Sequence, residues 1–333
     1  MPQSLIKIII FLFGSLIGSF LNVCIYRMPK MKRIIPDELK LILKDDLAVN
    51  KVWKNLMDNK YIDEDGNIGK IFTDFKESDK FKIEGCPQDK KEQIYKIMKA
   101  SCKISVNDPP RSFCPYCQKP ILWYDNIPFV SYIFLGGKCR FCKKTIPFRY
   151  FLVEFITAVL LVILYNFFGL TSHFFIYGAL TCALIAATFI DFDFQIIPDE
   201  ITLGGLVLGI LFSIIFPQLH NASSSINSLI QSILGILVGG GSIYLIGKFG
   251  QIVFKKESMG GGDVKFLAMI GSILGWEMAI LIFFLAPFFG AIVGITAKLT
   301  RGAEVIPYGP YLSIATFIAI IWGKNILNYF FCF

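Results

Sequence analysis

Seven long apolar segments run through this chain of 333 residues and restrict its possible folds more than any other feature. They are residues 8–26, 151–170, 174–190, 201–216, 229–246, 264–299 and 311–331. A helix needs about 20 apolar residues to cross a hydrocarbon core of about 30 Å, so residues 264–299 can cross twice. The sequence therefore predicts an all-α polytopic membrane protein with about eight transmembrane helices. The break inside 264–299 is expected near residues 275–277 or at Pro287.

Charged residues are concentrated in one insert between the first two apolar segments. Residues 27–149 hold 25 of the 33 Lys and Arg and 16 of the 25 Asp and Glu. That leaves 8 basic and 9 acidic residues for the other 210 positions, which excludes a soluble enzyme and a disordered chain. We predict three parts: a first transmembrane helix (1–26), a polar insert (27–150) and a transmembrane core (151–333).

The placement of Lys and Arg predicts the orientation in the membrane. If the insert is cytoplasmic and eight helices alternate, the turns near 191–200, 248–263 and 300–310 are cytoplasmic too. The insert, these turns and the two residues on either side of each turn account for every Lys and Arg except Lys7 and Lys324, and the opposite turns contain none. We expect an inner-membrane protein with its N-terminus outside. The net charge of +8 then suits anionic lipid, without a nucleic-acid partner.

Two C-x-x-C pairs lie in the insert, Cys114 with Cys117 and Cys139 with Cys142. Pairs at this separation can supply four thiolates to a tetrahedral Zn²⁺, and two disulfides or reduced thiols are the alternatives. A cytoplasmic position disfavours disulfides. We predict a zinc knuckle over about residues 108–148, whose role is structural because four sulfur ligands leave no position for a catalytic water.

Other residue types common in enzyme sites give no second candidate. The only histidines, His173 and His220, fall in turns predicted on the non-cytoplasmic side, so zinc hydrolysis and Ser-His chemistry lack support. Three cysteines lie in apolar segments and are expected to be small core residues. These are Cys24, Cys182 and Cys332.

Acidic residues beside apolar helices form two clusters at the predicted cytoplasmic face. Asp191, Asp193 and Asp199 follow the third apolar segment. Asp263 precedes the sixth segment, within the sequence Gly-Gly-Gly-Asp-Val-Lys of residues 260–265. Such acids are energetically unfavourable in a membrane and are functional candidates by default.

Asp191 and Asp263 are 72 positions apart, yet the predicted topology brings them to the same membrane face. Two carboxyls that are close together in a site of low dielectric share one proton, as in aspartic proteases. Gly260 and Gly262 would leave room for a backbone beside Asp263.

The alternative is that the acids cap helices or pair with Lys248 and Lys265. This alternative is favoured for Asp199, which stands where a helix N-cap would, and for Asp193 the two interpretations are balanced. In the catalytic interpretation, Asp193 and Lys265 tune the pair.

Five segments, in this order, resemble the type IV prepilin leader peptidases, membrane aspartic peptidases of the G-x-G-D kind (family A24). The N-terminal segment is Gly-Ser-Phe-Leu-Asn-Val at 18–23, followed by Arg-Met-Pro at 27–29. The C-x-x-C pairs flank Trp-Tyr-Asp-Asn-Ile-Pro at 123–128. D-x-D-x-x-x-x-P-D, G-x-G-D-x-K and I-P-Y-G-P follow at 191–199, 260–265 and 306–310.

The resemblance implies catalysis by Asp191 and Asp263 and cleavage of the leader of type IV prepilins and type II secretion pseudopilins. Cleavage would follow a Gly on the cytoplasmic side. It also implies S-adenosylmethionine-dependent N-methylation of the new N-terminal residue, without naming residues that bind the methyl donor. A peptidase without methylation is one alternative, and a proton-coupled transporter or a zinc-domain scaffold is another.

Two further features are open to more than one interpretation. Residues 31–110 form a longer, Lys-rich insert than the family suggests. Within it, residues 37–93 mix charge signs without a lasting apolar period, which favours a small solvated segment that is helical or partly ordered. It is either a decoration or a docking surface for a substrate or for pilus or secretion machinery. Glu154 either extends to the membrane interface or takes part in methyl transfer.

Overall fold

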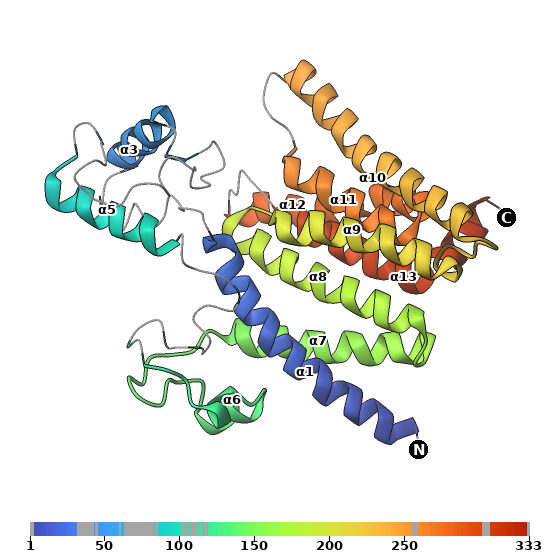
Figure 1. Ribbon diagram of the computed structural model, residues 1–333, viewed down its shortest axis with the longest axis horizontal. Coiled ribbons are helices and arrows are strands. Elements are labelled where there is room, and N and C mark those ends of the chain that lie inside the picture. Colours follow the sequence, from blue (N-terminus) through green and yellow to red (C-terminus); the bar gives the residue numbers. More distant parts are fainter. Residues whose placement is uncertain are drawn as a thin grey trace. The chain divides into compact units, whose positions relative to one another are not determined.

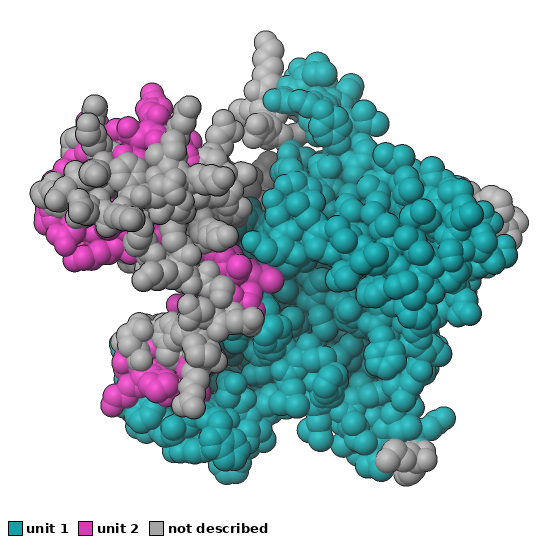
Figure 2. Space-filling model, viewed as in Figure 1, with its two compact units in different colours: residues 1–25, 122–333 teal, residues 26–121 magenta. Residues whose placement is uncertain are grey.

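The computed structural model describes two compact units, which are considered separately here (Figure 2). One comprises residues 26–121, and the other residues 1–25 with 122–333. The described residues are 3–31, 43, 46–59, 61–62, 83, 86–101, 106, 112, 114, 117, 119–254, 259–301 and 307–331. The predicted division at residues 27 and 150 was made on charge and stays a prediction.

The larger unit is built from long helices that follow the predicted apolar segments, which confirms the all-helical fold class (Figure 1). The single break inside 264–299 falls at Gly275, where φ is +85°, and Pro287 lies within a continuous helix. The helices are α1 (Gln3–Arg27), α7 (Phe148–Phe168), α8 (Ser172–Phe194), α9 (Asp199–Ile215), α10 (Ser225–Phe254), α11 (Gly261–Leu274), α12 (Trp276–Arg301) and α13 (Gly309–Phe331).

Six of the helices in the described part of the chain are long and apolar enough to cross a membrane, rather than the predicted eight. They are α1, α7, α8, α10, α12 and α13. Helices α9 and α11 have 17 and 14 residues, which correspond to about 26 and 21 Å at 1.5 Å per residue. The short α11 lies inside the bundle, since every residue from Phe266 to Ile273 is buried.

Glycines allow the backbones of α10 and α11 to touch. A Cβ added at Gly235 would collide with the carbonyl oxygen of Gly271, and one added at Gly271 with that of Gly235. One turn further along α10, a Cβ at Gly239 would lie 2.6 Å from the carbonyl oxygen of Leu267. Close approach through small residues is typical of membrane helices. It fixes α11, and with it Asp263 at its first turn, against α10.

The smaller unit contains α3 (Asp46–Asp58) and α5 (Gln88–Ser101), which confirms that part of the insert is helical. The prediction of a solvated segment without an apolar period is wrong for α3, because Val49, Val52 and Leu56 recur at helical spacing and are buried. They belong to a core that also includes Leu43, Tyr61, Ile62, Ile83, Ile94 and Met98.

Two shorter helices precede α7 in the larger unit. They are the 3₁₀ helix η3 (Trp123–Asn126) and α6 (Val130–Phe134). The 3₁₀ helix η4 (Pro217–His220) connects α9 to α10 at the opposite end of these helices from Asp199.

Candidate active site

Asp191 lies in the last turn of α8, just before the helix ends at Gln195 in a left-handed conformation. Its side chain is buried, and its Oδ2 accepts a hydrogen bond of 2.9 Å from the backbone N–H of Gly309. Gly309 is the first residue of α13, and a Cβ built on it would lie 2.8 Å from the same oxygen. The carboxyl of Asp191 is therefore held by a backbone that comes close only because residue 309 has no side chain.

Asp263 lies in the first turn of α11, outside all six candidate membrane spans. Its burial, and then the negative charge of Asp191, raise the pKa of Asp263 to about 7, opposed by a backbone hydrogen bond from Gly260. The influence of Asp191 means that the two carboxyls act on each other across the ends of α8 and α11.

Ile197 connects the two acids through packing. Its Cβ lies 3.4 Å from where a Cβ on Gly262 would be, next to Asp263. Its Cδ1 lies 3.3 Å from where a Cβ on Gly309 would be, next to Asp191. Ile197, in the α8–α9 connection, therefore packs beside a glycine at each acid. Neither glycine has a positive φ, so Gly309 is required for its close approach to Asp191 and not for a turn.

Tyr308 is a third group beside the pair, and the sequence predicts no role for it. Its hydroxyl is buried and has no hydrogen-bond partner in the part of the chain that the structure describes. Burial and the charge of Asp263 raise the pKa of Tyr308 to about 12, so it stays a neutral donor. The segment 306–310 was recognised by resemblance, but nothing in it indicated that Tyr308 and the N–H of Gly309 lie at the acids.

The remaining predicted site residues are placed differently. Asp193 forms an ion pair with Arg149 of α7. Asp199 pairs with Lys265 at 2.8 Å, so the expected pairing with this lysine is confirmed. Its expected N-cap role is wrong, because the N-cap of α9 is Pro198 and Asp199 is the first helical residue. Any influence of Asp193 or Lys265 on the acids would act through these partly exposed pairs.

The four cysteines of the C-x-x-C pairs form a candidate metal site. Their sulfurs all lie within 4.8 Å of one another, and no disulfide joins these four. Both pairs have the same turn, in which the first cysteine's N–H donates to a carbonyl five residues on. These bonds are Cys114 to Lys119 (3.0 Å) and Cys139 to Lys144 (2.8 Å). Zn–S bonds of about 2.3 Å place tetrahedral sulfurs about 3.8 Å apart, so the cluster fits zinc.

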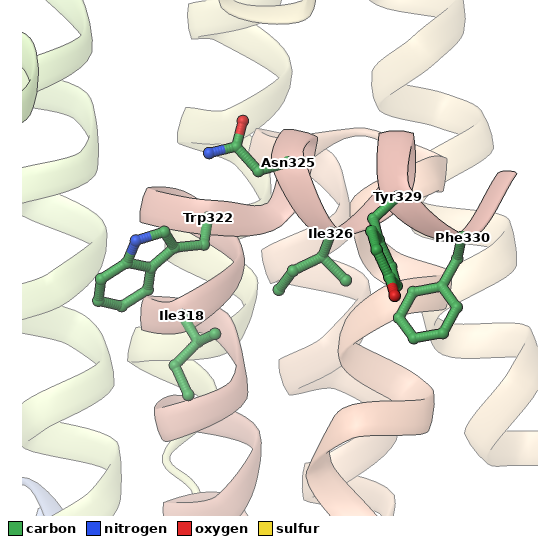
Figure 3. Close-up of a pocket in the computed structure, with 6 residues that line it drawn as sticks. All are labelled: Ile318, Trp322, Asn325, Ile326, Tyr329 and Phe330. Atoms are coloured by element: carbon green, nitrogen blue, oxygen red, sulfur yellow. The ribbon is translucent and has the colours of Figure 1, made fainter. Parts of the chain in front are cut away.

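An apolar groove on α13 offers no competing chemistry (Figure 3). It has a volume of about 360 Å³ and contains no acidic side chain. Its lining residues are Ile318, Trp322, Asn325, Ile326, Tyr329 and Phe330. An open apolar groove on a membrane helix suits contact with lipid tails.

Comparisons with known proteins identify the family to which the chain belongs. Residues 12–168 match the bacterial peptidase A24 N-terminal domain, and residues 178–295 match the type IV leader peptidase family. The prepilin leader peptidase/N-methyltransferase of Aeromonas salmonicida strain A449 is 32% identical over 97% of this chain and 92% of its own length. The protein of that name from Pseudomonas aeruginosa is 33% identical, over 95% and 90%.

A third relative, the prepilin leader peptidase/N-methyltransferase of Dichelobacter nodosus, is 31% identical over 95% of this chain and 91% of its own length. No solved structure matches the chain. Near-complete alignment at this identity, together with the two family matches, leads to one conclusion. The chain belongs to the type IV leader peptidase family.

Proposed function

We propose that this protein is a membrane aspartic endopeptidase and N-methyltransferase. It removes the leader of type IV prepilins and type II secretion pseudopilins after a Gly, and then methylates the new N-terminal residue. The observation that carries the proposal is the convergence of Asp191 and Asp263 at the start of α13. The names of the relatives support both activities.

In the proposed hydrolysis the two carboxyls share one proton, which Asp263 holds below about pH 7. The ionised Asp191, oriented by the N–H of Gly309, takes a proton from water. The water oxygen attacks the carbonyl carbon of the scissile peptide while the protonated carboxyl of Asp263 donates to the carbonyl oxygen. When the C–N bond breaks, the leaving nitrogen takes the proton that Asp191 received from water, and one hydroxyl of the tetrahedral intermediate returns its proton to Asp263.

We further propose that all eight helices α1 and α7–α13 contribute to a bundle in the bacterial inner membrane. The short α11 fits because neighbouring helices enclose it, and an enclosed helix need not span the lipid alone. Helix α9 has 17 residues, about the minimum for a span, and exposes apolar side chains such as Leu203 and Val207. With the N-terminus outside, the insert and both acids face the cytoplasm, in agreement with the distribution of Lys and Arg. The three parts 1–26, 27–150 and 151–333 are proposed on the same basis.

Methyl transfer requires a donor that the chain's own residues cannot replace. S-adenosylmethionine would supply the methyl group from its sulfonium, breaking a C–S bond as a C–N bond forms. The new N-terminal ammonium must lose one proton before its nitrogen can attack. The product is a methylated amine and a neutral thioether.

Incubation of the full-length protein in detergent with a synthetic prepilin, with and without S-adenosylmethionine, tests the proposal. We expect cleavage in both samples and a mature N-terminus heavier by one CH₂ only when the donor is present. Cleavage without added mass would reduce the proposal to a peptidase alone, and an uncut prepilin would overturn it.

Zinc content provides a separate prediction. We expect about one zinc ion per purified chain, because the four clustered sulfurs fit tetrahedral coordination. Cys117→Ser should remove most of this zinc by mass spectrometry and lower the melting temperature of the chain, since a structural zinc contributes folding free energy. Cys86→Ser, outside the cluster, is the matched control and should retain the zinc. A wild-type chain without metal would contradict the prediction.

A further inference from the structure

We propose that Glu154 is the anionic centre of the site that binds the methyl donor, and that it recognises the sulfonium cation together with a cluster of four phenylalanine rings. The inference rests on the proposed methyltransferase activity and assigns it a place. The rings are those of Phe11, Phe129, Phe151 and Phe155.

The carboxylate of Glu154 is held by neutral donors only. Its Oε2 accepts a hydrogen bond of 3.1 Å from the backbone N–H of Phe129, and the hydroxyl of Ser19 donates to the same side chain. No Lys or Arg in the described part of the chain forms an ion pair with it. Among the described residues the carboxylate is therefore oriented without a positively charged partner, and a cationic ligand would complete the site.

The backbone at Phe129 is arranged to present its N–H to this carboxylate. Phe129 has φ of +60° and ψ of −52°, and Val130 donates to the carbonyl of Pro128 at 2.6 Å across it. This is a γ-turn of the rare, strained kind, and a residue with a side chain seldom occupies it. Strain of this sort persists where the surroundings hold it and concentrates at ligand sites.

The helix α1 comes unusually close to Glu154. A Cβ added at Gly18 would lie 2.6 Å from the Cα of Glu154, so only a glycine allows this contact between α1 and α7. The same approach brings Ser19 to the carboxylate and Phe11, two turns earlier on α1, to the rings of the cluster.

The four rings come from three different segments and meet at Phe129. Its ring centroid lies 5.4 Å from that of Phe151, 5.7 Å from that of Phe11 and 6.5 Å from that of Phe155. Ring faces attract cations, and the attraction is strongest for a cation that loses its water at low cost. A sulfonium is such a cation, because it is only weakly hydrated. In the isolated chain Phe155 is 45% exposed and the other three rings are partly exposed.

The candidate donor site lies at the same end of the bundle as the acids. Arg149 of α7 pairs with Asp193 of α8, two residues beyond Asp191. Glu154 is five residues further along α7, a rise of about 7.5 Å. A new N-terminus produced at Asp191 and Asp263 is thus released near the proposed methyl donor.

Glu154→Gln tests the inference, because the amide oxygen of Gln still accepts from Phe129 and Ser19 while the charge is removed. Calorimetry on the full-length chain in detergent would compare S-adenosylmethionine with S-adenosylhomocysteine, whose sulfur is neutral. We expect the variant to bind the cationic donor at least about 10-fold more weakly and the neutral product within about 3-fold of wild type. Prepilin cleavage should persist without methylation.

Glu200→Gln, the same change on an exposed residue in the first turn of α9, is the matched control and should keep the wild-type preference. Phe155→Leu provides a second variant that leaves the carboxylate in place and should weaken binding of the cationic donor alone.

Suppose that the wild type binds the donor and transfers methyl, and that Glu154→Gln keeps the wild-type ratio of affinities for S-adenosylmethionine and S-adenosylhomocysteine. This result would overturn the inference and leave the proposed function standing. A wild-type chain that binds no donor would overturn both.

Discussion

Replacing Asp263 or Asp191 by Asn is expected to reduce cleavage of a synthetic prepilin on the order of 10³-fold, the size of effect associated with a lost general acid or base. Asn has nearly the same shape as Asp, so the chain should still insert and the helices should still pack. An amide neither holds the shared proton nor accepts one from water. Initial rates from gel or mass analysis of the cleaved leader would measure the loss.

Asp199→Asn is the matched control for this experiment. It makes the same chemical change at the same end of the bundle, but Asp199 is about half exposed and pairs with Lys265. Exposed ion pairs contribute between about 0 and 1 kcal/mol, so cleavage should stay within a few-fold of wild type. Normal processing by Asp191→Asn or Asp263→Asn would reject the pair, as a transporter or a scaffold predicts.

Gly309→Ala is expected to lower cleavage by roughly 100-fold, although it adds a single methyl group outside both acids. The new Cβ would lie 2.8 Å from Oδ2 and 3.3 Å from Cγ of Asp191. Backbone and carboxyl must separate, which lengthens the N–H bond to Oδ2 and displaces the carboxyl from Asp263. Reacting groups misplaced by about 1 Å lose on the order of 100-fold in rate.

Gly204→Ala provides the comparison for this variant. A Cβ at Gly204, within α9, meets no atom within 4 Å. The same methyl group should therefore leave cleavage unchanged, and both variants should give the wild-type helical content by circular dichroism. Wild-type cleavage by Gly309→Ala would show that the contact with Asp191 is not needed.

The long helices could be predicted from the sequence because each continuous apolar segment has one stable form in lipid. Whether α9 and α11 cross the membrane could not be predicted, because α9 has only 17 residues and the short α11 depends on its neighbours. Gly235 and Gly271 allow α10 to enclose α11, and this depends on a contact between distant residues. Length and hydropathy describe a helix alone and contain no information about what encloses it.

The pairing of Asp191 with Asp263 followed from topology, since both were expected at one membrane face. The groups that surround the two carboxyls could not be predicted from the topology. Gly309 reaches Asp191 from 118 positions further along the chain, and the neighbouring Tyr308 lies near Asp263. Only the fold of α13 against α8 brings them there. The N-cap expected at Asp199 failed because α9 begins one residue earlier than expected, with Pro198 at the N-cap, and the carboxylate of Asp199 pairs with Lys265 of another helix.

The pH dependence of kcat/KM for prepilin cleavage by the intact chain tests the shared proton most directly. Asp263 holds the proton below about pH 7, and the raised pKa means that it is lost as the pH rises through this value. Both carboxyls are then charged and no acid remains for the carbonyl oxygen. We predict that kcat/KM falls about tenfold per pH unit well above pH 7, with the same profile in Asp199→Asn. A rate that stays constant from about pH 6 to 9 would contradict the shared proton, and with it the assignment of these two aspartates.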